Sequence, residues 1–428
     1  MKKTKNKCII TKISAALMCM LILLQFTSCA RIAAAELSAA YNAEPEVPAR
    51  GTLGLDTHGD VITALQGLSL DVLRGAATDG GNTVVSPVSA LICLAMMANG
   101  ADGQTRAQIE SAVGVDIDTL NAFMEDFVAG LVSYEKCRLS VASSLWLNSG
   151  DPHLSVSEDF LRTNAKYYRS DVYSSDFGPG TVRDLNRWVK ETSLGMIDSI
   201  LEEIDTDAVM YLLSTVAFDA QWQEKYEKKS VRDADFTDAD GKTGQVKTLF
   251  STENRYLSGE GFTGFVKSYT GSKYAFVGLL PDEGTGVGTL LARLDGNTLT
   301  EMWQNARTGV KVYASIPAFE VETNTDLARV FRGLGVTDMF DPSLADFSKM
   351  GEYGDDGLFC SSFSQKTVIE LDENGTRAAS VSIGSMAPTS APPPDEVYYV
   401  YLNRPFVYMI IDVDTCLPVF AGNVGFCF

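Results

Sequence analysis

Residues 373–396 read Glu-Asn-Gly-Thr-Arg-Ala-Ala-Ser-Val-Ser-Ile-Gly-Ser-Met-Ala-Pro-Thr-Ser-Ala-Pro-Pro-Pro-Asp-Glu. Most of this stretch is small and uncharged, and it lies between two strand-like runs, 367–371 and 398–401. A structureless loop longer than about 15 residues is uncommon inside a compact domain, and such loops are usually functional or disordered. The composition alone also fits a flexible linker, so the rest of the chain must decide between the two.

The chain around this stretch reads as one mixed domain. Helical periodicity covers residues 58–75 and 90–98, and we expect another helix over 184–204. Strand-like apolar runs cover 82–86, 139–148, 211–218, 275–280, 311–316, 367–371, 398–401, 406–413 and 419–421. Helices and strands do not alternate regularly, and no internal repeat or low-complexity break divides 56 from 374. The predicted fold class is therefore α+β.

Composition excludes several classes of function. Hydrophobic residues make up 45% and charged residues 21%, which is a globular balance, and the net charge is −20. Nucleic acid and anionic membrane surfaces are therefore poor partners. His58 and His153 are the only histidines, so a multi-histidine metal site is excluded. Sequence motifs of hydrolases, metalloproteases and nucleotide-binding enzymes are absent, and we expect no enzyme activity, no metal and no cofactor.

The N-terminal residues are typical of a targeting signal. A lysine-rich start precedes an almost wholly apolar run, 13–26, which is long enough for a signal peptide and too short for a membrane span. Thr27-Ser28-Cys29-Ala30 follows and is similar to the bacterial lipoprotein cleavage box, in which the cysteine becomes a lipid-modified N-terminus. We expect a signal peptide over 1–28, a lipidated tether over 29–55 and an extracytoplasmic protein. The alternative is a plain secretory signal cut near residues 33–35.

Two cysteines lie close to the C-terminus. Cys416 and Cys427 stand eleven positions apart in the last strand-like region, and no pair of cysteines in the chain has CxxC spacing. A disulfide across a C-terminal hairpin and two free thiols are both compatible with the sequence, because sequence alone does not fix the geometry of a bridge.

Six short motifs, in order along residues 56–428, resemble those of the serpins, the serine-protease inhibitor family. They are NTVVSPVS (82–89, with Ser86 and Ser89), GADGQT (100–105), NRWV (186–189, with Thr192, Gly195 and Ile197), Phe218 with Trp222, the hinge Glu373-Asn374-Gly375-Thr376-Arg377-Ala378-Ala379-Ser380, and NRPF (403–406) with FAGNV (420–424). Each motif is weak by itself. The six in one order identify residues 56–428 as a serpin-like domain.

The resemblance implies a fold and a mechanism. The fold has three β-sheets and eight or nine helices, and residues 374–396 form an exposed reactive-centre loop. A target serine protease cleaves the loop and becomes an acyl-enzyme. The loop then inserts into the largest sheet as a new strand and traps the protease covalently. The implied protein is a monomer without cofactor. A glycosaminoglycan partner is not expected, because it needs a basic patch that an acidic chain does not offer.

The loop has the pattern that an inserted strand needs. Side chains of a strand alternate between two faces, and one set here is uncharged and mostly small: Thr376, Ala378, Ser380, Ser382, Gly384 and Met386. The other set carries one charge, Arg377, which must face solvent because burying it unpaired is costly. No proline occurs from 375 to 387, so every N–H can join the ladder. Fourteen residues of strand, 376–389, would span about 45 Å.

Counting along the loop predicts the cleaved bond. In inhibitory serpins the bond follows the fifteenth residue from the hinge glycine, which places it at Thr389–Ser390, with Met386–Ala387 as the second candidate. The loop has no Lys or Arg after Arg377, so a trypsin-like target is not expected. Pro388 and Thr389 suit the small apolar pocket of elastase-like or some subtilisin-like proteases.

Several positions depart from the family pattern. Asn and His usually pair where the sheet opens, near Trp222; this chain has Ser214 and Gln365 there, and we expect a Gln–Ser hydrogen bond in their place. The usual Lys at 318 is Ala318, so Glu373 is expected to lack its customary ion-pair partner, and the Lys after Phe218 is Asp219. These changes and Arg377 leave a non-inhibitory serpin, acting as a surface binding or chaperone-like protein, as the alternative function.

Overall fold

The structure is a computed structural model that describes residues 32–38, 41, 52–78, 80–131, 133–204, 208–354, 357–376 and 396–428. Contacts divide the chain into Met1–Ala34 and Ala35–Phe428, and all described helices and strands belong to the second unit. None of these helices is long and apolar enough to cross a bilayer.

One sheet has seven strands and holds the predicted hinge. Its order is β1 (Ala35–Glu36), β5 (Asp171–Ser175), β3 (Cys137–Asn148), β6 (Met210–Gln221), β15 (Gly375–Thr376), β14 (Ser364–Leu371) and β12 (Phe319–Asp326). β3 and β5 are parallel, and the other neighbours are antiparallel. The hinge therefore enters the middle of this sheet as the two-residue strand β15.

A nine-stranded sheet packs against it, and a third sheet has two strands. The nine strands follow the path β16 (Val397–Tyr401), β11 (Arg307–Pro317), β8 (Thr243–Gly259), β9 (Phe262–Ser268), β10 (Tyr274–Pro281), β17 (Phe406–Asp412), β18 (Pro418–Val424) and β2 (Thr83–Val85), with β7 (Val231–Thr237) beside β8. The small sheet pairs β4 (Leu154–Val156) with β13 (Gly351–Tyr353). Phe218 of the first sheet meets Phe420 of the second, with ring centroids 6.5 Å apart, so one apolar layer joins the two sheets.

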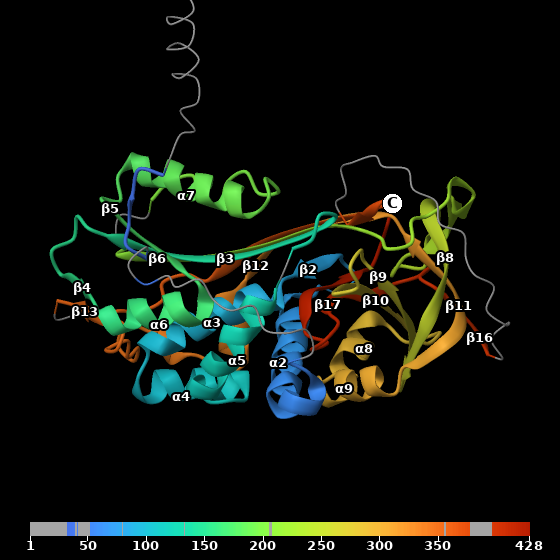
Figure 1. Ribbon diagram of the computed structural model, residues 1–428, viewed down its shortest axis with the longest axis horizontal. Coiled ribbons are helices and arrows are strands. Elements are labelled where there is room, and N and C mark those ends of the chain that lie inside the picture. Colours follow the sequence, from blue (N-terminus) through green and yellow to red (C-terminus); the bar gives the residue numbers. More distant parts are fainter. Residues whose placement is uncertain are drawn as a thin grey trace, which may run out of the picture. The chain divides into compact units, whose positions relative to one another are not determined.

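The helices gather around the sheets (Figure 1). They are α2 (Leu55–Ala76), α3 (Pro87–Gly100), α4 (Gly103–Val113), α5 (Ile117–Gly130), α6 (Glu158–Tyr168), α7 (Pro179–Thr192), α8 (Val287–Arg293), α9 (Gly296–Gln304) and α10 (Leu327–Gly333). In Figure 1, α7 lies on one face of the seven-stranded sheet and α3, α5 and α6 lie on the other. α7 packs against β3 and β6, whereas β12 and β14 alternate between buried and exposed residues, so a strand added to the middle would bury one face and turn the other toward solvent.

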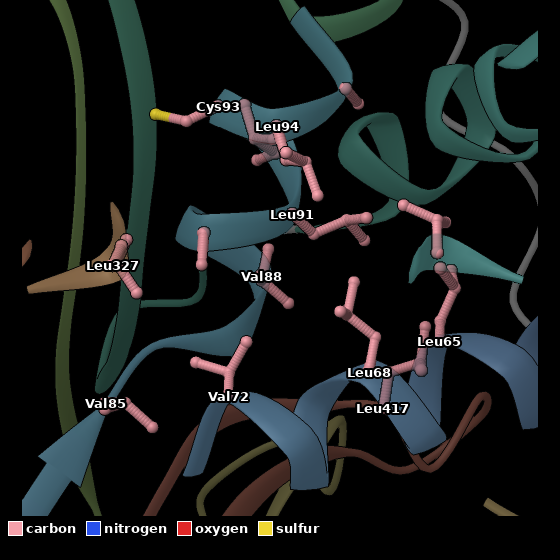
Figure 2. Packing of buried hydrophobic residues seen from close by; sticks show 14 of the residues in the cluster. Leu65, Leu68, Val72, Val85, Val88, Leu91, Cys93, Leu94, Leu327 and Leu417 are labelled. Carbon is pink, nitrogen blue, oxygen red and sulfur yellow. The ribbon is translucent and has the colours of Figure 1, made fainter. Parts of the chain in front are cut away.

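The packing of α3 explains its apolar sequence. Nearly every side chain from Pro87 to Gly100 is buried, which is typical of a helix surrounded on all sides. Figure 2 shows Val88, Leu91 and Leu94 in one cluster with Leu68 and Val72 of α2. Ser86 starts the helix because its hydroxyl accepts a hydrogen bond from the N–H of Ser89 at 3.4 Å.

The strand predictions agree with the structure, but the helix expected over 184–204 is confirmed only as far as Thr192. α7 begins at Pro179 and ends at Thr192. Leu194 and Gly195 adopt φ values of 54° and 72°, which an α-helix cannot contain, so the chain leaves the helix there. Cys416 and Cys427 are both free thiols, so the open question of a disulfide between them is settled against a bridge.

Candidate functional site

The candidate site is a gap between β6 and β14, and the hinge stands at its entrance. Gly375 pairs with Gln221 and Thr376 with Ala220 on β6, while Thr376 pairs with Leu371 on β14. Because both strands are antiparallel to β15, they run parallel to each other. Beyond Thr376, no pairing joins β6 to β14 in the described residues. The facing edges of the two strands are therefore unpaired with each other beyond the hinge, as the route of an added antiparallel strand would require.

A cavity lies directly ahead of Thr376 in this gap. Its volume is about 310 Å³, and its lining comes from both strands, the underlying sheet and the segment after α7: Gly195, Met196, Asp198, Phe218, Glu320, Val368, Ile369, Glu370, Thr376, Ile410 and Phe420. The cavity is partly open to solvent, since Asp198, Glu320 and Glu370 in its lining are exposed. The void is bordered by Thr376, so a continuation of β15 would run along it.

Farther along the gap, the expected Gln365–Ser214 hydrogen bond is absent, and that prediction was wrong. Gln365 instead pairs with the backbone of Ser86: its Oε1 accepts from the Ser86 N–H at 2.8 Å, and its Nε2 donates to the Ser86 carbonyl at 2.9 Å. The side-chain amide of Gln365 thus pairs with the backbone of Ser86 as a backbone amide would. Both the Oε1 and the Nε2 of Gln365 are used in this contact, and the side chain does not reach across the gap.

Ser214 faces Gln365 across a second, small cavity. Both residues line a space of about 20 Å³, together with Ser89 and Cys93. The Ser214 hydroxyl is buried and has no oxygen or nitrogen partner among the described residues. It lies beside the Cys93 thiol, whose pKa is raised to about 12 by burial. A thiol is only a weak hydrogen-bond partner, so a polar group entering the gap would give the Ser214 hydroxyl a stronger one.

Trp222 holds the base of the hinge. It is 1% exposed and stacks on Tyr269, with ring centroids 4.5 Å apart. Its indole N–H donates to the carbonyl of Asp372 at 2.9 Å, and its backbone N–H donates to the carbonyl of Asn374 at 3.1 Å. The hydroxyl of Thr376 forms a hydrogen bond with that of Tyr269, and the two oxygens lie 2.5 Å apart. One aromatic pair therefore fixes both ends of the turn that leads into β15.

Position 318 is Ala and offers Glu373 no cation, as expected, but Glu373 has a different ion-pair partner. Lys247 of β8 places its Nζ 2.5 Å from Glu373 Oε2. The backbone of Lys247 accepts a hydrogen bond from the N–H of Ala318 at 2.8 Å, so the cation comes from a strand adjacent to the position where the family carries lysine. The hydrogen bond from Lys247 lowers the pKa of Glu373 below its ordinary value. Sequence reasoning missed Lys247 because no motif links β8 to the hinge.

Gly375 is required by its close approach to β6. A Cβ at this position would lie 1.9 Å from the carbonyl oxygen of Ala220. Any side chain would push β15 away from β6, so the glycine allows the hinge to enter the sheet.

The other predicted site residues lie outside the described residues. These are Cys29, the hinge residues Arg377, Ala378, Ala379 and Ser380, and the candidate bonds Thr389–Ser390 and Met386–Ala387. Within the described residues, no group of three or more His, Cys, Asp or Glu side chains is placed to hold a metal ion.

Comparisons with known proteins point to one family. The family model described as Serpin (serine protease inhibitor) matches residues 63–425. The chain is 27% identical over 357 residues to glia-derived nexin of Rattus norvegicus, covering 80% of this chain and 87% of the relative. It is 28% identical over 364 residues to the leukocyte elastase inhibitor of Equus caballus, covering 80% of this chain and 92% of the relative.

Solved structures agree. The native state of tengpin, described as a thermophilic serpin, gives a TM-score of 0.82 at 38% identity and covers 92% of this chain and 99% of its own. Its latent state gives a TM-score of 0.76 at 37% identity, covering 86% of this chain and 98% of its own.

The Lys247–Glu373 ion pair makes a testable contribution to stability. Because Glu373 has a lowered pKa in the folded state, the stabilisation is present above its ordinary pKa and is lost as the pH falls through the lowered value. Both side chains are partly exposed, so the pair is worth about 0.5 kcal/mol. Lys247→Met should lower the thermal midpoint by about 1 °C at about pH 7, and the difference should vanish in acid.

A matched control is Lys229→Met, which removes the more exposed Lys229–Glu227 pair and should leave the midpoint nearly unchanged. The expectation would be contradicted by a difference between the parent and Lys247→Met that persists at low pH.

Proposed function

The chain belongs to the serpin family, and from this premise we propose that it is a suicide-substrate inhibitor of serine proteases. Membership places it among protease inhibitors and not among enzymes. The proposed mechanism is insertion of the cleaved loop, residues 374–396, between β6 and β14. The observation that carries the proposal is the cavity that begins at Thr376 and lies between these two strands.

The register of β15 supports this route. Continued in steps of one residue, the pairing of Thr376 with Ala220 and Leu371 would set Ala378 opposite Phe218 and Ile369, two residues that line the cavity. A small side chain is what this space admits, and the alternate residues of the loop are mostly small.

The same register gives a role to the altered sheet-opening pair. Ser382 would come between Ser214 and Gln365 and face the core as Thr376 does. Its hydroxyl would supply a partner for the buried hydroxyl of Ser214. The substitution at 214 is thus compatible with insertion.

Arg377 would occupy the opposite face of the inserted strand, between Asp219 and Glu370. Asp219 is already paired with Arg138 on β3, and Glu370 lies directly opposite Glu320 on β12. A guanidinium placed among these carboxylates would relieve like-charge repulsion. The acidic residue at 219 and the basic residue at 377 would then be complementary, and Arg377 would favour insertion.

The covalent step is an acyl transfer at the proposed bond Thr389–Ser390. The protease's catalytic serine oxygen attacks the Thr389 carbonyl carbon, its proton passes through the catalytic histidine to the Ser390 nitrogen, and the C–N bond breaks. The resulting ester is hydrolysed unless insertion carries it away first. An elastase-like or subtilisin-like enzyme is the proposed target, and the similarity to a protein named leukocyte elastase inhibitor supports the first of these.

We propose an extracytoplasmic location, with residues 1–28 as a signal peptide, Cys29 as the lipidated anchor, 29–55 as a tether and 56–428 as a monomeric inhibitory domain. Cys29→Ser should move the protein from the membrane fraction to the soluble fraction. An unchanged distribution would contradict the anchor.

The function is tested by mixing the chain with elastase-, subtilisin-, trypsin- and chymotrypsin-type proteases. A covalent adduct that survives denaturing electrophoresis is expected with the first two, and mass spectrometry should find a released peptide that begins at Ser390. A peptide beginning at Ala387 would move the bond to the second candidate. Turnover without an adduct would favour the non-inhibitory alternative.

Charge reversal tests the inserted register. Arg377→Glu should slow insertion about tenfold, equivalent to about 1.4 kcal/mol, because the new carboxylate would meet Asp219 and Glu370. More protease would then escape, and the number of inhibitor molecules consumed per trapped protease would rise. Asp219→Lys in the same chain should restore trapping, which a double-mutant cycle would measure. A double variant no better than Arg377→Glu would refute the register.

A further inference from the structure

An exposed strip of large side chains covers the outer face of β16 and the strands beside it. We define the aromatic strip as Val397, Tyr399 and Tyr401 of β16, Tyr313 of β11 and Phe250 of β8. Tyr399 is 65% exposed, Val397 46% and Tyr401 37%. The pleat of the strand causes this pattern, because the intervening Val400 is fully buried and Tyr398 stacks on Tyr256 with centroids 3.9 Å apart.

The rings of the strip touch one another. Tyr313 stacks with Tyr399 at a centroid distance of 5.4 Å, Tyr399 lies 6.2 Å from Tyr401, and Tyr401 lies 6.3 Å from Phe250. The rings are held in place by one another and by the β16–β11 pairing. Rigid aromatic side chains lose little entropy when a partner covers them, which is why such residues are enriched at interfaces.

Two cations flank the strip in an otherwise acidic chain. The Arg232 guanidinium lies 3.7 Å from the centroid of Phe250, and the Lys311 ammonium lies 4.6 Å from that of Tyr313. Neither cation forms an ion pair within the part of the chain that the structure describes. The net charge of the whole chain is −20, so this face suits a partner that brings carboxylates and apolar groups.

β16 is also an edge strand. Among the described strands it pairs only with β11. Edge strands are usually protected by charges or proline, and an aromatic edge invites contact. The right-hand side of Figure 1 shows β16 and β11 side by side at the end of this sheet.

We propose that the aromatic strip is a docking surface for the target protease, which it contacts in addition to the reactive loop. The inference rests on the proposed function. Its occupant follows from chain continuity, since Ser390 precedes Tyr399 by nine residues, a reach of at most about 30 Å. A protease domain of about 200 residues has a radius of gyration of about 16 Å, so the strip is within reach of an enzyme engaged at Thr389–Ser390.

The test separates docking from trapping. Elastase-type and subtilisin-type proteases whose catalytic serine is replaced by alanine bind without acylation, and surface plasmon resonance with the full chain gives the Kd. Tyr399→Ala should raise the Kd about tenfold. Lys311→Glu should raise it and weaken its salt dependence. Phe359→Ala removes an aromatic side chain of similar exposure (45%) outside the strip and should have no effect.

Three results would overturn the docking inference: equal affinities for the parent and Tyr399→Ala, no binding of the parent to either protease, or a dimer of the parent that Tyr399→Ala abolishes, which would make a second copy the occupant. Active proteases report the proposed function separately. Strip-dependent binding without a covalent adduct would keep the docking surface and remove the inhibitory mechanism. A covalent adduct together with binding that does not depend on the strip would keep the inhibitory mechanism and remove the docking surface.

Discussion

In the described residues, the parallel strands β6 and β14 are joined only through the two-residue strand β15, and this incomplete pairing is the constraint on which the proposed mechanism depends. Two hinge residues bridge the strands at one end, and beyond them the described residues provide a cavity where a packed sheet would have side chains. Backbone groups in a covered sheet gain most when they are paired. In the proposed mechanism, one more strand would supply hydrogen bonds and burial that the intact protein lacks, and a kinetic barrier would preserve the intact state.

Contacts from both large sheets hold the hinge and β14 in place. Trp222 binds the carbonyls on both sides of Glu373, and Lys247 binds its carboxylate from the other sheet. Lower in the gap, Gln365 anchors β14 to the start of α3. Over the gap lies the segment that follows α7, which contributes Gly195, Met196 and Asp198 to the cavity wall. In the proposed mechanism, an entering strand would pass beneath that segment, so the segment would have to move while the strands separate.

Much of this arrangement could be predicted from the sequence, and the remainder could not for definite physical reasons. The hinge glycine and Trp222 could be predicted because each belongs to a short motif with a local meaning, whereas the small alternating residues of the loop lie outside the described residues and stay a prediction. The partner predicted for Gln365 was wrong and the partner of Glu373 was missed, because Ser86 at the start of α3 and Lys247 on β8 meet the seven-stranded sheet only through tertiary packing. The end of α7 was misplaced because apolar spacing continues past Thr192, while the backbone turns at Leu194 and Gly195.

The central claim is that the native chain stores free energy which its own loop can release. The most direct measurement is the thermal midpoint of the chain after a single cut in the loop, compared with that of the intact chain under the same conditions. If the severed segment fills the space between β6 and β14, the cut protein must unfold at a clearly higher temperature, although it has lost a covalent bond. A cut protein that unfolds at the same or a lower temperature would contradict the account.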